Sequence, residues 1–336
     1  MKKRNIFISA ALVLVGILAF CFAINKAAEL KEYQKTSCMK LEHEIDAVSA
    51  EQAAIDFMKN EKKQLVFWSK ERTGACENPM FNRSMKMKEM IFCGELSLLL
   101  PECGSTGERE WSQECIVDEE ASLQLFGNKN ATGQMIELGG KKYTICLTIK
   151  GEEGVVIRKA ETGELLQYVS TRGKQGENLE AIQKLTMNYG IAGEEIMLSL
   201  FYCIASLILG LIPAVCGVLG VVQLLNIWKG EKQKIKIGWL EKGFAGLVAA
   251  ILILWICMKL FQPELGISLY PLSDFDSWSQ QIKWIAKQLP RTMEMEKPWI
   301  LATFFTAFRK CLSASALSAV CLWSGIRLYE RRINGV

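Results

Sequence analysis

The chain has 336 residues, of which 50% are hydrophobic and 23% are charged, with a formal net charge of +4. It contains a single histidine, so a multi-histidine zinc site and a metalloprotease of the HExxH type are excluded. The charge is a sum of opposite regions, because residues 25–195 hold 22 Lys or Arg against 28 Asp or Glu, a balance of −6. The positive total is therefore no sign of nucleic-acid binding, and we expect no nucleic-acid partner.

Four long apolar stretches predict membrane-spanning helices, because a helix of about 20 apolar residues crosses the hydrocarbon core. We therefore expect an α+β extracytoplasmic domain inserted between the first and second of four transmembrane α-helices, with membrane lipid as a partner. In chain order, the expected parts are 1–24, the cytoplasmic N-terminus and first span; 25–195, the extracytoplasmic domain; 196–228, the second span; 229–238, a short basic cytoplasmic loop; 239–261, the third span; 262–298, an extracytoplasmic loop with an amphipathic helix; 299–328, the fourth span; and 329–336, a cytoplasmic tail.

Basic residues beside these stretches predict the orientation of the chain. The segments MKKR at the start, KGEKQKIK between the second and third spans and RLYERR near the end all fall on one side if the chain crosses four times. Lys and Arg are enriched in the cytoplasmic loops of membrane proteins. We therefore expect a multi-pass protein of a bacterial plasma membrane, with both termini in the cytoplasm and the large domain outside.

The first span has two alternative interpretations as a targeting sequence. A cleaved signal peptide normally ends in small residues at alternate positions, whereas here Cys21-Phe22-Ala23 follows an unusually long apolar core. A lipoprotein site ending at Cys21 would place the bulky Phe20 where a small residue is usual. We favour an uncleaved anchor over both alternatives.

Helix and strand signals alternate within the extracytoplasmic part, which predicts a mixed α+β fold. Residues 25–36 can continue the first helix, and Ser49 with Gln52 forms a capping-box pattern before a second helix. Asp118 is the expected N-cap of a short helix that stops at Gly127. The expected strands are Gln64–Trp68, Lys88–Cys93, Glu114–Val117, Tyr143–Lys150 and Gly154–Arg158, with a hairpin turn at Gly139-Gly140 and a further helix over Glu177–Asn188.

The segment ASLQLFGNKNATGQMIELGGKKYTICLTIKGEEG, residues 121–154, resembles the core of MacB-like periplasmic domains. In that family a helix ending in Leu-Phe-Gly leads through a turn with a glycine to a β-hairpin carrying Gly-Gly-x-x-Tyr-Thr. The matching residues, to which the resemblance assigns a structural role, are Leu125, Phe126, Gly127, Gly133, Gly140, Tyr143 and Thr144. The order of one span, one large domain and three further spans is similar to that of MacB-like and FtsX-like ABC transporter permeases.

This resemblance implies a permease-like subunit that works with a separate ABC ATPase, as part of a homo- or heterodimer. Coupled permeases of the family carry a coupling helix with a Glu-Arg-x-x-Glu-Ile-Gly-like stretch after the second span, whereas this chain has the short segment WKGEKQKIKIGW there. Its candidate partner contacts are Lys232, Lys234 and Lys236, and the alternative role of these lysines is to anchor the loop at anionic lipid.

Two functional hypotheses therefore stay open. The first is a transmembrane subunit of a MacB/FtsX-type ABC transporter or envelope mechanotransmission complex, without ATPase activity of its own. The second is a degenerate relative that does not transport and whose extracytoplasmic domain binds or scaffolds an envelope partner. An ATPase encoded beside this chain would favour the first hypothesis.

Motifs of the common catalytic sites are absent from the sequence. There is no Gly-x-x-x-x-Gly-Lys-Ser/Thr loop to cradle phosphate and no Gly-x-Ser-x-Gly elbow to hold a nucleophile. His43 stands between Glu42 and Glu44, a pattern that we interpret as a solvated helix face. We expect no enzymatic activity, no catalytic or metal-binding residue and no cofactor.

Six of the twelve cysteines fall in the extracytoplasmic part: Cys38, Cys76, Cys93, Cys103, Cys115 and Cys146. An even number permits disulfides, and six cysteines allow fifteen pairings. The candidate bridge involves Cys93, Cys103 or Cys115, each near the end of an expected strand, and the alternative is a fully reduced domain. No Cys-x-x-Cys pair occurs, so a redox site is not indicated.

Three features of the membrane part bear on mechanism. Residues 196–228 are free of charge and longer than a bilayer core needs, so this span projects outward as a stalk or is tilted or broken. Trp278, Ile282, Ile285 and Leu289 recur at helical spacing, which fits a helix in the outer interface or one packed on the domain. Arg309 and Lys310 interrupt the fourth stretch, so we expect them to snorkel to the bilayer edge or to meet an acidic partner.

Overall fold

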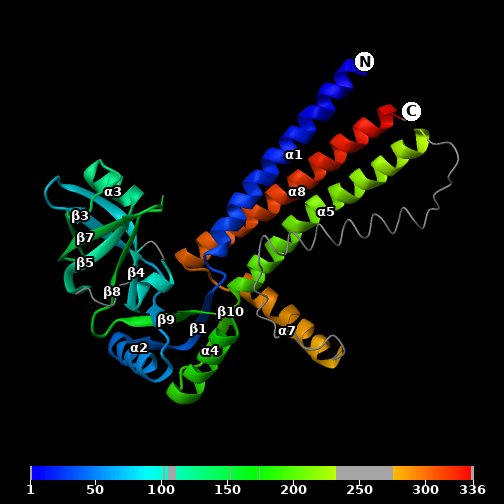
Figure 1. Ribbon diagram of the computed structural model, residues 1–336. Helices are drawn as coiled ribbons and strands as arrows, with labels where there is room; N and C mark the ends of the chain where they lie inside the picture. The colour runs from blue at the N-terminus through cyan, green and yellow to red at the C-terminus, as the bar shows by residue number, and fades with distance from the viewer. Residues whose placement is uncertain are drawn as a thin grey trace. The chain divides into compact units, whose positions relative to one another are not determined.

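The computed structural model of the chain describes residues 2–100, 103–104, 111–151, 153–173, 175–231 and 275–333. These residues fall into two units (Figure 1). The helical unit consists of α1 (Lys2–Lys31), α5 (Leu198–Glu231) and the part of α8 (Trp299–Ile333) that follows Ala302. The sheet unit contains Lys35–Leu198 together with α7 (Phe275–Glu294) and the residues that lead from it to Ala302.

Strands and short helices alternate through the sheet unit, so the predicted mixed α+β character is confirmed. Its helices are α2 (Ala47–Glu61), α3 (Glu119–Phe126) and α4 (Gln175–Tyr189), with 3₁₀ turns η1 (Leu96–Leu98) and η3 (Trp111–Gln113). Its strands are β1 (Thr36–Asp46), β2 (Leu65–Trp68), β3 (Arg72–Asn78), β4 (Arg83–Gly94), β5 (Glu114–Asp118), β6 (Met135–Leu138), β7 (Lys141–Ile149), β8 (Val155–Lys159), β9 (Leu165–Arg172) and β10 (Gly193–Ile196).

The ten strands are paired in the order β10-β1-β9-β2-β4-β3-β6-β7-β5-β8, and β4 also pairs with β8. That extra pairing is parallel and closes six strands, from β4 round to β8, into a ring. The remaining strands extend from β4 as an open sheet. β4 belongs to both parts, because its last residues, Phe92–Gly94, pair with β2. Gly94 is required there, since a Cβ would lie 2.3 Å from the carbonyl oxygen of Leu65.

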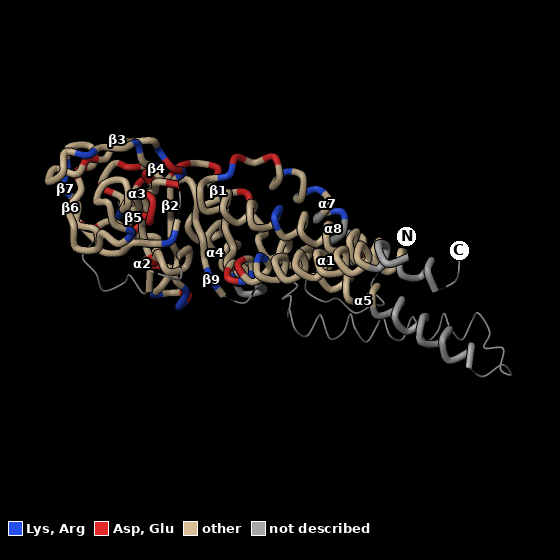
Figure 2. The backbone as a smooth tube through the Cα atoms, turned by 90° about the horizontal axis from the view of Figure 1, so that it is seen from above, with Lys and Arg blue, Asp and Glu red and all other residues tan. Residues whose placement is uncertain are grey.

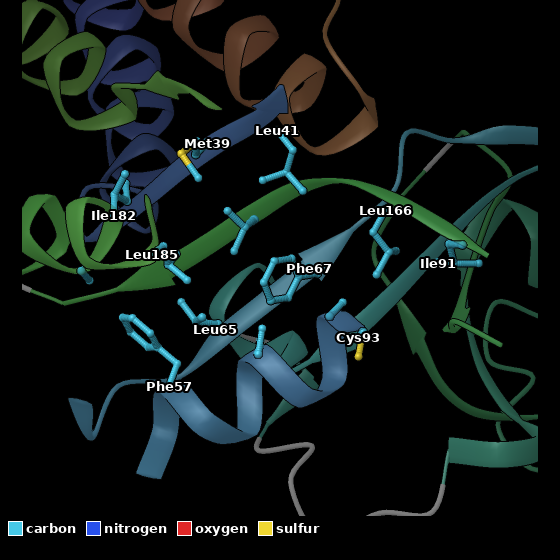
Figure 3. Close-up of a cluster of buried hydrophobic side chains, with 14 residues drawn as sticks. Met39, Leu41, Phe57, Leu65, Phe67, Ile91, Cys93, Leu166, Ile182 and Leu185 are labelled. Carbon is cyan, nitrogen blue, oxygen red and sulfur yellow. The ribbon is translucent and has the colours of Figure 1, made fainter. Parts of the chain in front are cut away.

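The open sheet buries one hydrophobic core beneath α2 and α4. Ala50, Ala53 and Phe57 of α2 meet strand residues that include Leu65 and Phe67 (Figure 3). From the other helix, α4, come the buried Ala181, Ile182 and Leu185. Burying a large side chain such as Phe57, which is 0% exposed, stabilises a fold by about 1.5–3 kcal/mol. α2 and α4 therefore pack against the open sheet and bury this core between helices and strands.

The second helix forms as predicted, but its first turn differs from the expected capping box. Asp46 is the N-cap, and its side chain accepts hydrogen bonds from the amides of Val48 and Ser49 at 3.0 and 3.1 Å. A carboxylate satisfies these free amides and also favours the positive end of the helix dipole. Ser49 is therefore inside the helix, and the expected capping role of Ser49 and Gln52 is wrong.

A second core lies in the ring and is closed by α3. It contains residues from all six ring strands, together with Ala121 and Leu125 of α3. The prediction for this helix is confirmed at both ends: Asp118 is its N-cap, and Gly127 ends it with φ of 74°. The hairpin between β6 and β7 is also confirmed, with Gly139 and Gly140 at φ of 58° and 79°, the backbone of a tight primed turn.

The segment around His43 is extended and not helical. Residues 36–46 form β1, which pairs with β9 on one side and β10 on the other. Pairing on both sides explains the outcome, because β1 buries its first half, including the side chains at 38, 39 and 41, between two neighbouring strands, whereas the side chains at 42–44 are exposed. The interpretation of His43 as part of a solvated helix is therefore wrong, although its side chain is solvent-exposed.

Two described helices are long and apolar enough to cross a membrane, Phe7–Lys31 within α1 and Trp299–Leu328 within α8. A shorter apolar helix, Leu198–Pro213, forms the first part of α5. In Figure 2, most of α1 carries no charged residue, in contrast to the strands of the sheet unit. The expected third span over 239–261 lies outside the described residues, as do most of the loop 229–238 and the end of the tail 329–336.

α1 and α8 pack against each other in opposite directions. The hydroxyl of Ser9 donates to the carbonyl oxygen of Gly325 at 2.7 Å, and the thiol of Cys311 lies 3.5 Å from the carbonyl oxygen of Ala23. On α1 the buried positions Ser9, Gly16 and Ala23 recur every seven residues. Small residues at such a seam let two helix backbones approach closely, which is how helices associate in lipid. The two ends of the chain consequently lie at the same end of this helix pair (Figure 1).

α5 runs parallel to α8. Near the start of both helices, the Phe201 ring lies 4.8 Å from the Phe305 ring and 5.3 Å from the Phe308 ring, in edge-to-face contacts. Further along, residues 208–216 of α5 and 312–326 of α8 line one apolar groove. If both helices span a bilayer, the chain between them must return across it, which is the role expected of the apolar run 239–261.

The close approach of α1 and α8 predicts that Gly325→Leu destabilises the helical unit by about 1–3 kcal/mol, the usual range for overpacking. A Cβ at residue 325 would lie 2.8 Å from Cγ2 of Val13 and 3.2 Å from the carbonyl oxygen of Ser9. Thermal unfolding of the detergent-solubilised full chain measures the effect. Val320→Leu is the matched control, because Val320 is 63% exposed on the same helix. Equal melting temperatures for the two variants would contradict the tight seam.

Candidate functional site

A polar pocket of about 490 Å³ opens on the ring beside the β6–β7 hairpin. We call it the Arg158 pocket. Its lining contains five carboxylates and two cationic side chains, together with one tyrosine, and consists of Gly74, Ala75, Glu77, Glu89, Glu137, Leu138, Gly139, Gly140, Lys141, Tyr143, Arg158, Glu161 and Glu164. Strands β3, β4, β6, β7 and β8 and the turn after β8 each contribute to it, so it forms only when the ring is closed.

Arg158 is held by two carboxylates inside this pocket. Its Nε donates to Glu89 at 2.6 Å, and its Nη1 and Nη2 donate to the two oxygens of Glu164 at 2.9 and 2.6 Å. Burial acts to lower the pKa of Arg158, but the hydrogen bond to Glu164 and the charge of Glu89 raise it above its ordinary value. The guanidinium therefore ties β8 to β4 and to the turn that leads to β9.

Tyr143 and Glu161 extend the network toward the hairpin. The Tyr143 hydroxyl donates to Glu161 at 2.9 Å, and Lys141 forms an ion pair with the same carboxylate. Burial and the hydrogen bond to Glu161 raise the pKa of Tyr143 to about 12. Hydrogen bonds from Lys141 and Tyr143 lower the pKa of Glu161 below its ordinary value. Tyr143 is thus neutral at pH 7, and its hydroxyl is held by the Glu161 carboxylate.

The residues matched to the MacB-like motif come together around the ring. Leu125 is buried in the ring core, and Phe126 packs against it. Gly127 and Gly140 adopt positive φ at the end of α3 and in the hairpin, and Gly133 does so at 85° while its amide donates to Ile145. Tyr143 places its ring in the core and its hydroxyl in the Arg158 pocket. These residues build and close the ring.

A second candidate site is the strand pair β1–β10, which lies next to α1 and α5 in the chain. β1 begins five residues after α1 ends, and α5 begins directly after β10. β1 and β10 are hydrogen-bonded neighbours, with Cys38 opposite Ile196 and Leu41 opposite Gly193. The chain therefore enters and leaves the sheet unit on paired strands, which we call the β1–β10 hub.

The start of α8 is attached to the same sheet. The amide of Trp299 donates to the Glu71 carboxylate at 2.9 Å, and Lys70 forms an ion pair with Glu296. Glu71 and Lys70 both lie in the connection between β2 and β3. Arg291 of α7 lies 3.6 Å from Glu194 of β10, so α7 is joined to the hub as well. The alternative in which the 262–298 helix packs on the domain agrees with these contacts.

Of the candidate bridge cysteines, Cys93 and Cys115 are free thiols in the structure. Cys93 is in the core beneath α2, whereas Cys115 is in the ring core, so these two are not paired with each other. Burial raises the pKa of Cys93 to about 12 and raises that of Cys115 still further above its ordinary value. A bridge from either residue to the half-buried Cys103 stays a prediction. Lys232, Lys234 and Lys236 lie outside the described residues.

Sequence reasoning missed the Arg158 pocket and the attachment of α8. A signal for the first was present, because Arg158 ends the apolar strand run VVIR, and a cation in such a run needs partners. Glu89 and Glu164 are far from each other in the chain, so their convergence depends on ring closure. Within the described ranges, no group of three or more His, Cys, Asp or Glu is arranged to hold a metal ion.

Buried thiols with raised pKa predict an order of alkylation in the folded chain. At pH 7.5 and without denaturant, we expect iodoacetamide to modify Cys103 before Cys76, Cys93 and Cys115, because a buried thiol has little reactive thiolate. Peptide mapping by mass spectrometry measures the order, and the denatured protein is the control. Resistance of Cys103 that disappears after reduction would show a disulfide and would contradict the expected order.

The Arg158 network predicts a stability that depends on pH. Burial acts to raise the pKa of Glu164, but hydrogen bonds from Arg158 and the Glu161 amide lower it below its ordinary 4.5. A depressed pKa contributes stability above pH 4.5 that is lost as the pH falls through the folded value. We therefore expect Glu164→Gln to lower the free energy of unfolding by about 1–3 kcal/mol at pH 7, and by much less at pH 3.

Thermal unfolding between pH 3 and 7 tests this expectation. Glu153→Gln is the matched control, because Glu153 pairs with Lys88 at the surface, where such pairs contribute about 0–1 kcal/mol. A Glu164→Gln effect that stays constant across this pH range would contradict the assigned role.

Comparison with known proteins gives two distant structural neighbours. One is the periplasmic region of MacB from Actinobacillus actinomycetemcomitans, with 11% identity, a TM-score of 0.39, and coverage of 48% of this chain and 87% of that one. The other is the extracellular domain of the noncanonic ABC-type transporter YknZ from Gram-positive bacteria, with 10% identity, a TM-score of 0.35, and coverage of 48% and 97%. No protein-family model and no curated protein matches the chain.

Proposed function

We propose that this chain is a permease-like transmembrane subunit of a MacB/FtsX-type assembly, which passes movement between its membrane helices and its extracytoplasmic domain and has no ATPase activity of its own. The observation that carries the proposal is the β1–β10 hub. Its two strands continue into α1 and α5, so a shift of one helix against the other acts directly on a pair of hydrogen-bonded strands.

The attachment of α8 gives the same sheet a third connection to the helices. Glu71, which accepts from the Trp299 amide, lies just after β2, and β2 is separated from β1 by β9 alone. A strand ladder is stiff along its hydrogen bonds, so relative movement of the three helices tilts the open sheet as one body. β4 then carries the tilt into the ring, because its backbone is shared by both parts.

The direction of the helices supports the expected topology. α1 is antiparallel to α8 and α5 is parallel to it, the arrangement required if the chain leaves the cytoplasm through α1 and returns through α5 and α8. In this orientation both termini are cytoplasmic and the sheet unit is outside, in a bacterial plasma membrane. The expected cytoplasmic loop at 229–238, with Lys232, Lys234 and Lys236, would then face a separate ABC ATPase.

An assembly of two such chains, identical or related, follows from the family resemblance, as does the absence of nucleic acid among the partners. We propose no catalytic role for the described residues, because the Arg158 pocket has its tyrosine neutral and its arginine held by two carboxylates. Its place at the junction of β4, β8 and the turn to β9 makes it a fastener between the open sheet and the ring.

One observation favours the alternative function, a scaffold that binds an envelope partner. Met80 and Phe81 are 69% and 57% exposed at the turn between β3 and β4. Asn78 fixes this turn, since its carboxamide oxygen accepts from the amides of both residues. Two large apolar side chains held in water on a rigid turn are typical of a contact surface. A binding tip is compatible with either function, and the ATPase distinguishes them.

Co-purification tests the proposed function. The full chain, isolated from its native membranes in mild detergent, is expected to carry a partner with a nucleotide-binding loop and vanadate-sensitive ATP hydrolysis. Replacing Lys232, Lys234 and Lys236 together by Glu is expected to remove at least nine-tenths of this activity. The matched control is Lys283→Glu with Lys287→Glu, which changes two exposed lysines of α7. A well-folded chain without any nucleotide-binding partner would support the scaffold function instead.

A further inference from the structure

The contacts between α1 and α8 determine how deep each α8 residue lies relative to α1. Ser9 is level with Gly325, and Ala23 is level with Cys311, so 14 residues separate the two contacts on each helix. The apolar run of α1 ends at Ile24, and Asn25 and Lys26 follow it. Lys310 therefore lies at the level where the apolar surface of α1 ends. This level is the outer edge of the hydrocarbon in the proposed orientation.

Two cations at this level have no acidic partner among the described residues. The guanidinium of Arg309 lies 3.4 Å from the hydroxyl of Thr306, and Lys310 has neither a hydrogen bond nor an ion pair from its ammonium group within the described ranges. Lys26, at the same depth, is neutralised by Glu29 one turn away. A cation at the bilayer edge without a carboxylate is stabilised by the phosphate of a lipid head group.

A groove leads from Lys310 along the helix pair. It has a volume of about 440 Å³ and is lined by Val15, Leu18, Ala19 and Phe22 of α1 and by Lys310, Ser313, Ala314 and Leu317 of α8. Apart from Lys310 and Ser313 the lining is apolar, and Leu18, Phe22 and Leu317 are 61%, 48% and 52% exposed. The polar end and the apolar length of the groove are thus arranged like the head and the chain of a lipid.

We propose that this groove binds one anionic phospholipid of the outer leaflet, with its phosphate at Lys310 and an acyl chain along Leu18 and Leu317. The single charge at the head end makes the match specific to an acidic head group, since a zwitterionic lipid brings a second cation to the same place. Small residues make the groove possible, because Ala19, Ser313 and Ala314 leave room between the helices. The site is independent of the proposed ATPase, as it needs only α1 and α8.

The groove between α5 and α8 has a different character. Its lining residues are uncharged, and Arg327 lies over the Trp323 ring, 4.9 Å from the ring centroid, at the end that faces the cytoplasm in the proposed orientation. The lipid of the outer leaflet is therefore assigned to the α1–α8 groove, whose own lining contains a cation at the outer end.

Native mass spectrometry of the full chain tests the proposal. The detergent-solubilised protein is mixed with equal amounts of phosphatidylglycerol and phosphatidylcholine with identical acyl chains, and the retained adducts are counted. We expect the wild type to prefer phosphatidylglycerol, and Lys310→Gln to reduce the preference about fivefold, since one cation near a lipid surface contributes about that factor. Lys310→Arg is expected to keep the preference, and this variant also controls for folding.

Two further variants separate a defined site from a general belt of charge. Arg309→Gln removes a cation at the same depth that does not line the groove, and it is expected to leave the preference within twofold of the wild type. Ser313→Phe fills the groove at an exposed position and is expected to reduce adducts of both lipids.

Three results would overturn the proposal. A preference unchanged in Lys310→Gln would remove the phosphate contact, and an equal loss in Arg309→Gln would indicate a non-specific belt. Displacement of phosphatidylglycerol by free glycerol phosphate at similar concentration would show that the head group alone binds and that the groove has no role.

Discussion

The pairing of β1 with β10 is the contact on which the rest of the structure depends, because it joins the strand that follows α1 to the strand that precedes α5. The ladder is short, with four residue pairs from Cys38–Ile196 to Leu41–Gly193, and β10 is an edge strand. It also requires a particular residue: a Cβ at Gly193 would lie 2.2 Å from the carbonyl oxygen of Lys40, a backbone atom that cannot move aside. An edge strand of this length has little stability by itself. β10 is linked covalently to α5, and Glu194 on β10 lies 3.6 Å from Arg291 of α7, a surface pair of the kind that contributes about 0–1 kcal/mol.

β4 also connects two parts of the structure, the open sheet and the ring. Its first residues pair with β3, its middle with β8 and its end with β2, so a single strand is part of both the ring and the open sheet. A shared strand makes the two cores mechanically continuous although their side chains are separate. Arg158 adds to this continuity from β8, since its carboxylate partners belong to β4 and to the turn before β9. Buried ion pairs of this kind contribute less to net stability than to the definition of one arrangement. The Arg158 pocket is therefore a joint between β8, β4 and the turn before β9.

Sequence patterns predicted those parts of the fold that depend on neighbouring residues. Asp118 and Gly127 mark the ends of α3, and Gly139-Gly140 marks a hairpin, because caps and primed turns need particular side chains or positive φ at particular positions. The prediction failed where distant partners decide the outcome. β1 contains Glu42, His43 and Glu44, whose polarity resembles a solvated helix, and its strand character follows from pairing with β9 and β10, more than a hundred residues away. Ring closure through β4 and β8, and with it the Arg158 pocket, was beyond local reasoning for the same reason. Cys93 and Cys115 are near strand ends as expected, yet their strands bury them in different cores.

The proposed position of the bilayer also gives the aromatic residues at the start of α8 a role. If Lys310 lies at the outer edge of the hydrocarbon, as we propose, then Phe304, Phe305 and Phe308 lie beyond that edge, where they pack against Tyr33 of the segment after α1 and Phe201 of α5. Within hydrocarbon the helices gain no hydrophobic stabilisation by associating, because lipid solvates their apolar faces as well as protein does. Their association there depends on close packing at the seam of small residues. Beyond the edge, in water, the same aromatic side chains are driven together, and each large side chain so buried contributes about 1.5–3 kcal/mol. Separation of the three helices therefore costs most in this aromatic cluster and least within the lipid.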